Sequence, residues 1–371
     1  MHTLPPIMHG WTLDKKMPVA PERVLEALRP VQDPELHRSL VDLGMIRNLL
    51  VDDQGAVTFT LVLTTPACPL KDFIVEECTT AAKEVAGVSA VHIDVTAETP
   101  QQRELPGKEG IPGVRNIIAV SSGKGGVGKS TVAVNLAVAL AQTGANVGLI
   151  DADIYGPNVP IMMGVQGVPV TVEKTPTGDR VEPLDNYGVK LVSMALLIAE
   201  DQPVVWRGPM LNGIIRQFLY QVNWGELDYL IVDMPPGTGD VQLTLAQAVP
   251  MAGVIIVTTP QRVALHDARK GLRMFQQLGV AVLGLVENMS YFIPPDRPEK
   301  RYYLYGSGET EKFAQNIGVE VLGEVPQEML VREGGDDGRP IVVAHPESSS
   351  AEAFRILAGK VAARVSVAAL S

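Results

Sequence analysis

The chain has 371 residues, and its 31 Lys and Arg residues against 42 Asp and Glu residues leave a formal charge of −11. This balance argues against a protein that coats nucleic acid, and the lack of a long uncharged apolar run favours a cytoplasmic protein without stable membrane association. The length favours two domains, and the two cysteines, Cys68 and Cys78, predict no disulfide because a helix between them would hold them roughly 15 Å apart.

The first 97 residues predict a mobile arm followed by a small α+β domain. Residues 1–19 contain prolines and mixed charge without periodicity, which is typical of an arm. Residues 20–97 form the domain, with predicted elements as follows: a helix at 21–28, a turn at 31–36, strands at 46–51 and 57–65, a helix at 71–85 and a strand at 90–95. Residues 98–112 are polar with Pro and Gly, and predict a linker.

Residues 113–371 predict an α/β domain with a doubly wound, mostly parallel sheet. Short apolar strands alternate with helices, as in sheets covered on both faces. The predicted strands are 117–120, 147–150, 190–194, 229–232, 254–257, 282–286 and 321–325, and the main predicted helices are 131–143, 210–220, 265–278 and 350–365. In such sheets ligands bind at the carboxyl ends of the strands.

A glycine-rich loop follows the first of these strands. The pattern G-x-x-x-x-G-K-S between a strand and a helix predicts a phosphate-binding loop, in which backbone amides and the start of the helix face the anion. Lys129 is expected at the β- and γ-phosphates, and Ser130 at Mg²⁺. The predicted ATP-binding residues are Gly123, Lys124, Gly125, Gly126, Val127, Gly128, Lys129, Ser130 and Thr131.

Acidic residues end two later strands at the same edge of the sheet. Asp233 is the candidate Mg²⁺ ligand together with Ser130, and Asp151 is a further metal candidate. Asp153 is the candidate for orienting the attacking water, since phosphoryl transfer depends on positioning and charge compensation. The alternative is that these aspartates cap helices or begin turns.

The segment PPGTGD at 235–240 predicts a nucleotide-sensitive loop. A backbone amide such as that of Gly237 could bond a γ-phosphate in one state and not in another. A rigid turn is the alternative, and the sequence leaves both open.

Lys124 lies inside the loop, where most phosphate loops carry no charge. GKGGVGKS resembles the deviant Walker A loop of the family that contains the MinD and ParA positioning ATPases, the nitrogenase iron protein and the Mrp/ApbC iron–sulfur carriers. The resemblance implies a homodimer in which Lys124 reaches the partner's phosphates, much as an arginine finger does. A solvated lysine is the alternative.

Four further stretches resemble the Mrp/ApbC branch of that family. They are IDADIYGPNVP at 150–160, VWRGPM at 205–210, DMPPGTGD at 233–240 and VENMSYF at 286–292. The resemblance implies that Asn288, and the backbone near Pro326, contact the adenine. A strand-end cap is the alternative for Asn288.

The N-terminal domain resembles SufT/PaaD-like iron–sulfur assembly domains. DPEL at 33–36, VDLGMI at 41–46 and TTPACPL at 64–70 carry the likeness. Cys68 comes where a strand gives way to a helix, with Pro69 suited to the first helical turn, so a lowered thiol pKa and a metal-binding or thiol-transfer role are expected. A buried structural cysteine is the alternative, and is the expectation for Cys78.

The chain departs from the Mrp/ApbC pattern in one respect. Members of that branch usually follow the Tyr-Phe pair with a Cys-x-x-Cys pair that holds a shared cluster, but Pro294 and Arg297 stand there instead. Neither can replace a thiolate as an iron ligand. Cys68 from two chains offers two thiolates where a cluster takes four ligands, so a bound cluster would need ligands from elsewhere.

Together these features predict a cytoplasmic, homodimeric Mg-ATP-dependent ATPase of slow turnover. Its predicted role is to bind iron–sulfur clusters or transfer them to apoproteins, with apo iron–sulfur proteins or assembly factors as partners and no nucleic acid. One alternative is a positioning ATPase, which requires a basic or amphipathic anchor. Another is a nucleotide-dependent scaffold without cluster chemistry.

Overall fold

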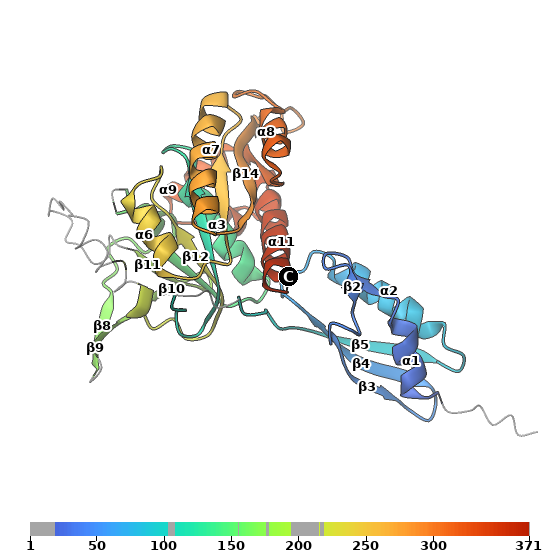
Figure 1. Ribbon diagram of the computed structural model, residues 1–371. Coiled ribbons are helices and arrows are strands. Elements are labelled where there is room, and N and C mark those ends of the chain that lie inside the picture. Colours follow the sequence, from blue (N-terminus) through green and yellow to red (C-terminus); the bar gives the residue numbers. More distant parts are fainter. Residues whose placement is uncertain are drawn as a thin grey trace, which may run out of the picture. The chain divides into compact units, whose positions relative to one another are not determined.

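The computed structural model describes residues 19–102, 108–154, 156–175, 178–193, 215 and 219–370. The chain forms two compact units (Figure 1), which are described separately: unit 1 is the chain up to Leu63 with Leu70–Thr96, and unit 2 is Thr64–Pro69 with the chain from Ala97 onward. Three predictions fall wholly or largely outside the described residues: the arm at 1–19, the VWRGPM stretch at 205–210 and the helix at 210–220.

Unit 1 is a three-stranded sheet with two helices. Its sheet has the order β3-β4-β5, in which β3 (Ile46–Val51) and β4 (Ala56–Leu63) are antiparallel and β5 (Ala90–Ala97) follows. Alternate residues of β4 are buried, and α2 (Lys71–Lys83) buries Ile74, Cys78 and Ala82 at helical spacing. α1 (Pro21–Leu28) adds Val24 and Leu28 to this core, and a small hairpin, β1 (Gln32–Asp33) and β2 (Arg38–Ser39), encloses the predicted Asp-Pro turn.

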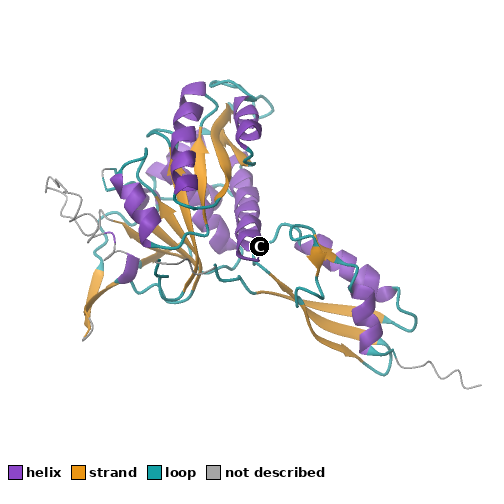
Figure 2. Ribbon diagram, viewed as in Figure 1, coloured by secondary structure: helices purple, strands orange, loops and turns teal. Residues whose placement is uncertain are grey.

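Unit 2 contains an eight-stranded sheet with the order β10-β11-β7-β12-β6-β13-β14-β15 (Figure 2). Only the edge pair of β10 (Leu184–Asn186) and β11 (Val189–Ser193) is antiparallel within this sheet. The remaining strands are β6 (Val114–Ser122), β7 (Val147–Asp151), β12 (Leu227–Asp233), β13 (Gly253–Thr258), β14 (Val282–Phe292) and β15 (Val321–Gln327). The predicted fold class, a mostly parallel α/β sheet preceded by a small α+β unit, is confirmed.

Helices cover both faces of this sheet, and the central strand β6 shows why. Its side chains alternate between two apolar clusters: Ile118 and Val120 lie in one, and Ile117 and Ala119 lie in the other. The first cluster includes α3 (Lys129–Gln142) and α11 (Ser349–Leu370), and the second includes α6 (Asp240–Ala248) and α7 (Arg262–Gln277). Because both of its faces are covered, β6 is apolar over residues 117–120, as the sequence pattern indicated, while the buried polar residues Asn116, Ser121 and Ser122 flank this stretch.

Several elements had no separate prediction. These are the hairpin of β8 (Thr171–Thr175) and β9 (Gly178–Glu182), the edge strand β10, the helices α6 and α8 (Glu309–Ile317), and the short helices α4 (Val159–Met162), α9 (Met329–Asp336) and α10 (Ile341–Ala344). β14 also runs to Phe292, six residues past the predicted strand end. In the described part of the chain, no helix combines the length and apolar character needed to cross a bilayer.

Candidate nucleotide-binding site

The glycine-rich loop lies at the centre of the sheet edge, between β6 and α3. β6 is the central strand whose carboxyl end opens the loop, and α3 begins at Lys129. Gly126 and Gly128 have φ values of 80° and 78°, in the left-handed region that side chains disfavour. The loop therefore bends back on itself before the helix, so that the start of α3 faces the same edge as the strand ends.

Two glycines are also required by close packing. A Cβ added at Gly123 would lie 2.2 Å from the carbonyl carbon of Asp267 in α7. One added at Gly128 would lie 2.1 Å from Nδ2 of Asn288, which donates a hydrogen bond to the carbonyl of Val127 at 2.8 Å. The loop is thus held between α7 on one side and the side chain of Asn288 on the other.

Lys129, Ser130 and Asp233 form a buried polar cluster beside the loop. The Lys129 ammonium lies 2.6 Å from Oδ1 of Asp233, and the Ser130 hydroxyl donates to Oδ2 of the same carboxylate at 2.6 Å. β12 brings Asp233 here because it pairs directly with β6, where Asp233 is opposite Val120. The structure therefore brings together three residues that the sequence assigned to phosphate and metal.

Asp151 ends β7, which lies one strand further from β6, and Asp153 follows in the loop after it. Oδ2 of Asp153 lies 3.9 Å from the Lys129 ammonium. The Asp151 carboxylate accepts hydrogen bonds from the Asp153 amide, the Val159 amide and the Ser193 hydroxyl, at 3.1, 3.3 and 3.0 Å. Asp151 thus holds the loop that carries Asp153. Because its carboxylate oxygens already accept these three hydrogen bonds, few of their lone pairs are left to bind a cation.

Burial changes the acidity of both strand-end carboxyls. It raises the pKa of Asp233, against which the Lys129 charge and the hydrogen bonds from Lys129 and Ser130 act. Burial, followed by the neighbouring charge of Asp233, raises the pKa of Asp151 to about 7. Two carboxyls compete here for one ammonium ion in a site that water reaches poorly, and such a site favours an additional cation.

Gly237 and Lys124 occupy the remaining positions around the loop. The Gly237 amide donates a hydrogen bond to the carbonyl of Ser122 at 3.0 Å, so the PPGTGD segment at 235–240 is bonded to the end of β6. The carbonyl of Lys124 accepts a hydrogen bond from Ser122 Oγ at 2.9 Å. None of the carboxylates that the structure describes forms an ion pair with the half-buried Lys124 side chain, which leaves its ammonium available to an anion.

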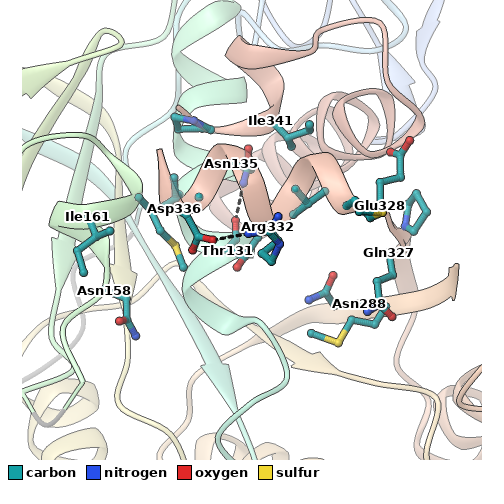
Figure 3. A pocket seen from close by; sticks show the side chains of 18 of the residues that line it. Thr131, Asn135, Asn158, Ile161, Asn288, Gln327, Glu328, Arg332, Asp336 and Ile341 are labelled. Carbon is teal, nitrogen blue, oxygen red and sulfur yellow. Dashed lines mark hydrogen bonds and ion pairs between the residues drawn. The ribbon is translucent and has the colours of Figure 1, made fainter. Parts of the chain in front are cut away.

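A pocket of about 450 Å³ lies beside the start of α3. Asn288 and Pro326, the two residues expected near adenine, both line it. Thr131 lines it as well, and Figure 3 labels Thr131 and Asn288. Asn135 and Arg332 line it as well and were missed by sequence reasoning: Asn135 donates to the Thr131 carbonyl at 2.9 Å, and Arg332 is paired with Asp336 at 2.8 Å. A mixed apolar and polar pocket of this size is suited to a nucleoside.

Cys68 lies in the Thr64–Pro69 segment, which packs within unit 2. Thr65 Oγ1 accepts a hydrogen bond from the Tyr229 hydroxyl at 2.9 Å, and Pro69 abuts Gly359 of α11. Cys68 itself is half-buried. Pro69 precedes the N-cap Leu70 and is not in the first helical turn, because α2 begins only at Lys71.

Cys78 is fully buried in α2, as expected for a structural cysteine, and burial raises its thiol pKa to about 12. Neither cysteine is in a disulfide. Among the described residues, no group of three or more His, Cys, Asp and Glu side chains is arranged to hold a metal ion. Within one chain, Cys68 is therefore the candidate thiolate, and one thiolate does not make a resident cluster site.

Two family models match the chain. The model described as NUBPL iron-transfer P-loop NTPase matches residues 113–362, and the model described as iron-sulfur cluster assembly protein matches residues 21–95. An iron-sulfur cluster carrier protein of Synechocystis sp. is 65% identical over 94% of this chain and 99% of its own length. A chloroplastic Fe-S cluster assembly factor of Arabidopsis thaliana is 42% identical over 91% of this chain and 62% of its own length.

A solved structure is similar to the part of the chain that carries the site. It is a nucleotide-binding protein of Archaeoglobus fulgidus in complex with ADP, with 39% sequence identity and a TM-score of 0.56. The likeness covers 65% of this chain and 92% of that one.

Proposed function

The chain belongs to the NUBPL-type family of iron-transfer P-loop NTPases, and from this premise we propose that it is a homodimeric, Mg-ATP-dependent switch that handles iron–sulfur clusters. Membership confirms the resemblance to Mrp/ApbC-type carriers with an N-terminal iron–sulfur assembly domain. ATP binding, slow hydrolysis, dimerisation and a cytoplasmic location are parts of the proposal.

The buried cluster of Lys129, Ser130 and Asp233 next to the 450 Å³ pocket carries the proposal. The pocket would take the adenine and ribose, with Asn288 and Pro326 on its wall. The amides of residues 123–131 and the start of α3 would bind the phosphates. All of these groups lie at one edge of the sheet. The Lys129 ammonium would therefore leave Asp233 and pair with phosphate oxygens when the nucleotide binds. The ADP complex of the Archaeoglobus fulgidus protein supports this placement.

The oxygens of Ser130 and Asp233 fit Mg²⁺. A hydroxyl and a buried carboxylate already 2.6 Å apart are hard donors, and Mg²⁺ takes one or two such ligands together with phosphate and water. Asp151, which lies next to this pair, would hold the loop that carries Asp153 through its hydrogen bonds to the Asp153 and Val159 amides. When bound, the ion would neutralise charge on the phosphate oxygens.

Lys124 and Asp153 are assigned the steps that use the triphosphate. Lys124 would reach the phosphates of the partner subunit, for which its ammonium has no competing ion pair among the described residues. Asp153 would orient the attacking water while Lys129 holds the phosphate. The Gly237 amide would give up its hydrogen bond to the Ser122 carbonyl and donate to the γ-phosphate instead. Hydrolysis would then reset the dimer.

Cluster handling rests on the relatives and on Cys68. The Synechocystis and Arabidopsis proteins are a cluster carrier and a cluster assembly factor by name. In this chain Pro294 and Arg297 stand in place of the usual thiol pair, so the remaining ligands would come from a second chain, a small thiol or the apo iron–sulfur protein that receives the cluster.

Dimer mass and nucleotide affinity test the switch. Native protein, Lys124→Ala and Lys129→Ala are compared by calorimetry and by light scattering with Mg-ATP, Mg-ADP and no nucleotide, with Lys360→Ala as an exposed-lysine control. We expect Lys129→Ala to lose nucleotide binding, and Lys124→Ala to bind nucleotide but stay monomeric with ATP. Absence of adenine nucleotide binding in folded native protein would refute the proposal.

Anaerobic reconstitution with iron and sulfide tests the cluster. We expect a chromophore in native protein and in Cys78→Ala, and its loss in Cys68→Ser. Transfer is then followed as the recovery of activity in an apo iron–sulfur enzyme. No chromophore in native protein, with nucleotide binding intact, would instead support a nucleotide-dependent scaffold, which the missing thiol pair favours.

A further inference from the structure

A groove of about 400 Å³ lies between α7 and α8, which run side by side in unit 2 (Figure 1). Arg262, His266 and Arg269 of α7 line one side, and Lys312 and the carboxylate Glu309 of α8 line the other. We call it the basic groove. None of these residues belongs to the nucleotide pocket described above.

The basic residues of α7 form a row because of their spacing. Residues 262, 266 and 269 are separated by four and then three positions, which places them on one face of a helix, and Arg273 continues the row. At about 1.5 Å per residue, the row from Arg262 to Arg273 spans roughly 16 Å. Two buried apolar side chains, Leu265 and Phe313, form the floor.

Few of the carboxylates that the structure describes neutralise this row. No carboxylate in the described ranges pairs with Arg262, His266 or Arg269, whereas the neighbouring Lys270 is paired with Asp267 at 3.1 Å. Lys312 is paired with Glu309 at 3.1 Å, but both are solvent-accessible, and such pairs contribute little. The groove therefore remains cationic in a chain whose overall charge is −11.

Arg269 is held in place without losing its donors. Its guanidinium lies over the ring of Phe313, 5.2 Å from the centroid. A cation–π contact uses no hydrogen-bond donor, so the N–H groups of Arg269 stay available to an anion. The groove thus offers fixed donors next to an apolar floor.

We propose that the basic groove binds a short acidic segment of a partner protein, in which an apolar side chain is flanked by Asp or Glu residues. The carboxylates would pair with Arg262, Arg269 and Lys312, and the apolar side chain would cover Leu265 and Phe313. A row of roughly 16 Å matches about five residues of extended chain. A long polyanion is disfavoured, because beyond the groove it meets a protein surface of net negative charge. The proposal depends on neither ATP nor a cluster.

Fluorescence anisotropy with the full chain tests this directly. The probe is a short fluorescein-labelled peptide rich in Glu with Leu between the acidic residues, at low ionic strength. The double variant Arg262→Glu/Arg269→Glu removes the groove, and Arg23→Glu/Lys83→Glu makes the same charge change at exposed sites of unit 1. Arg262→Glu alone leaves the Arg269 stacking intact, so a loss of binding there cannot arise from misfolding at Phe313.

We expect about 100-fold weaker peptide binding in the double groove variant, because two charge-assisted hydrogen bonds are lost and each loss should weaken binding about tenfold. Arg262→Glu should weaken binding about tenfold, and the unit 1 control about twofold or less. Equal loss in groove and control variants, or no binding to native protein, would overturn the proposal. So would a single-stranded oligonucleotide that displaces the peptide more effectively than the unlabelled peptide does.

Discussion

Gly123 provides a sharp test of the site geometry, because its neighbour in the same loop is a matched control. In Gly123→Ala the new Cβ would lie 2.2 Å from the carbonyl carbon of Asp267 and 2.4 Å from the amide nitrogen of Ala268. Ordinary contacts begin near 3.4 Å, so the loop or α7 must move by roughly 1 Å. Both obstructing atoms are backbone, so no side-chain rotation relieves the clash. We expect a loss of about 1–3 kcal/mol in the free energy of unfolding.

Gly125→Ala makes the same chemical change two residues away. A Cβ there meets nothing within 4 Å, and the φ of Gly125 is not left-handed, so we expect a change within about 0.5 kcal/mol or a slight gain from a less flexible unfolded chain. Urea unfolding followed by fluorescence is suitable, since Trp224 is buried in unit 2. If both variants unfold at the same urea concentration, the described contact between the loop and α7 is wrong.

Three further predictions concern buried groups. Burial raises the pKa of Cys78 to about 12 from 9.0, so at pH 8 iodoacetamide should modify Cys68 and spare Cys78, as mass spectrometry would show; labelling of both in folded protein would contradict the burial. The Tyr229 hydroxyl is bonded to Thr65, so Tyr229→Phe should cost about 0.5–1.5 kcal/mol of unfolding free energy, whereas the exposed Tyr302→Phe should cost nothing measurable. Burial raises the pKa of Asp151 to about 7 from 3.8, so between these values the unfolded chain loses a proton that the folded chain keeps, and stability falls as the pH rises through this range. The stability of Asp151→Asn relative to native protein should therefore be greater at pH 8 than at pH 4, and a difference that does not change with pH would argue against the raised value.

The predicted fold could be read from the sequence because its strands are buried on both faces. The middles of β6, β7 and β12 had to be apolar, and the carboxyl ends of β7 and β12 had to carry Asp151 and Asp233 to the edge where the glycine loop lies. Strand order could not be read in this way. That β12 lies next to β6, and β7 one strand further away, explains why Asp233 contacts Lys129 while Asp151 bonds its own loop.

The parts that escaped prediction depend on long-range packing. Asn135 and Arg332 line the pocket only because α9 folds back next to α3, which no local pattern encodes. The Thr64–Pro69 segment was predicted with the N-terminal domain, yet it packs within unit 2, since its partners Tyr229 and Gly359 are far away in the sequence. The basic row of α7 could have been found from its i, i+4, i+7 spacing, but its unpaired state could not.

β12 has two ends that do different things. Tyr229 holds the turn that carries Cys68, and four residues later Asp233 holds the lysine of the phosphate loop. The segment that carries Cys68 and the lysine of the phosphate loop are thus both attached to one strand. A shift of β12 by a fraction of an ångström would therefore displace both groups together, which couples the two positions mechanically within a single subunit.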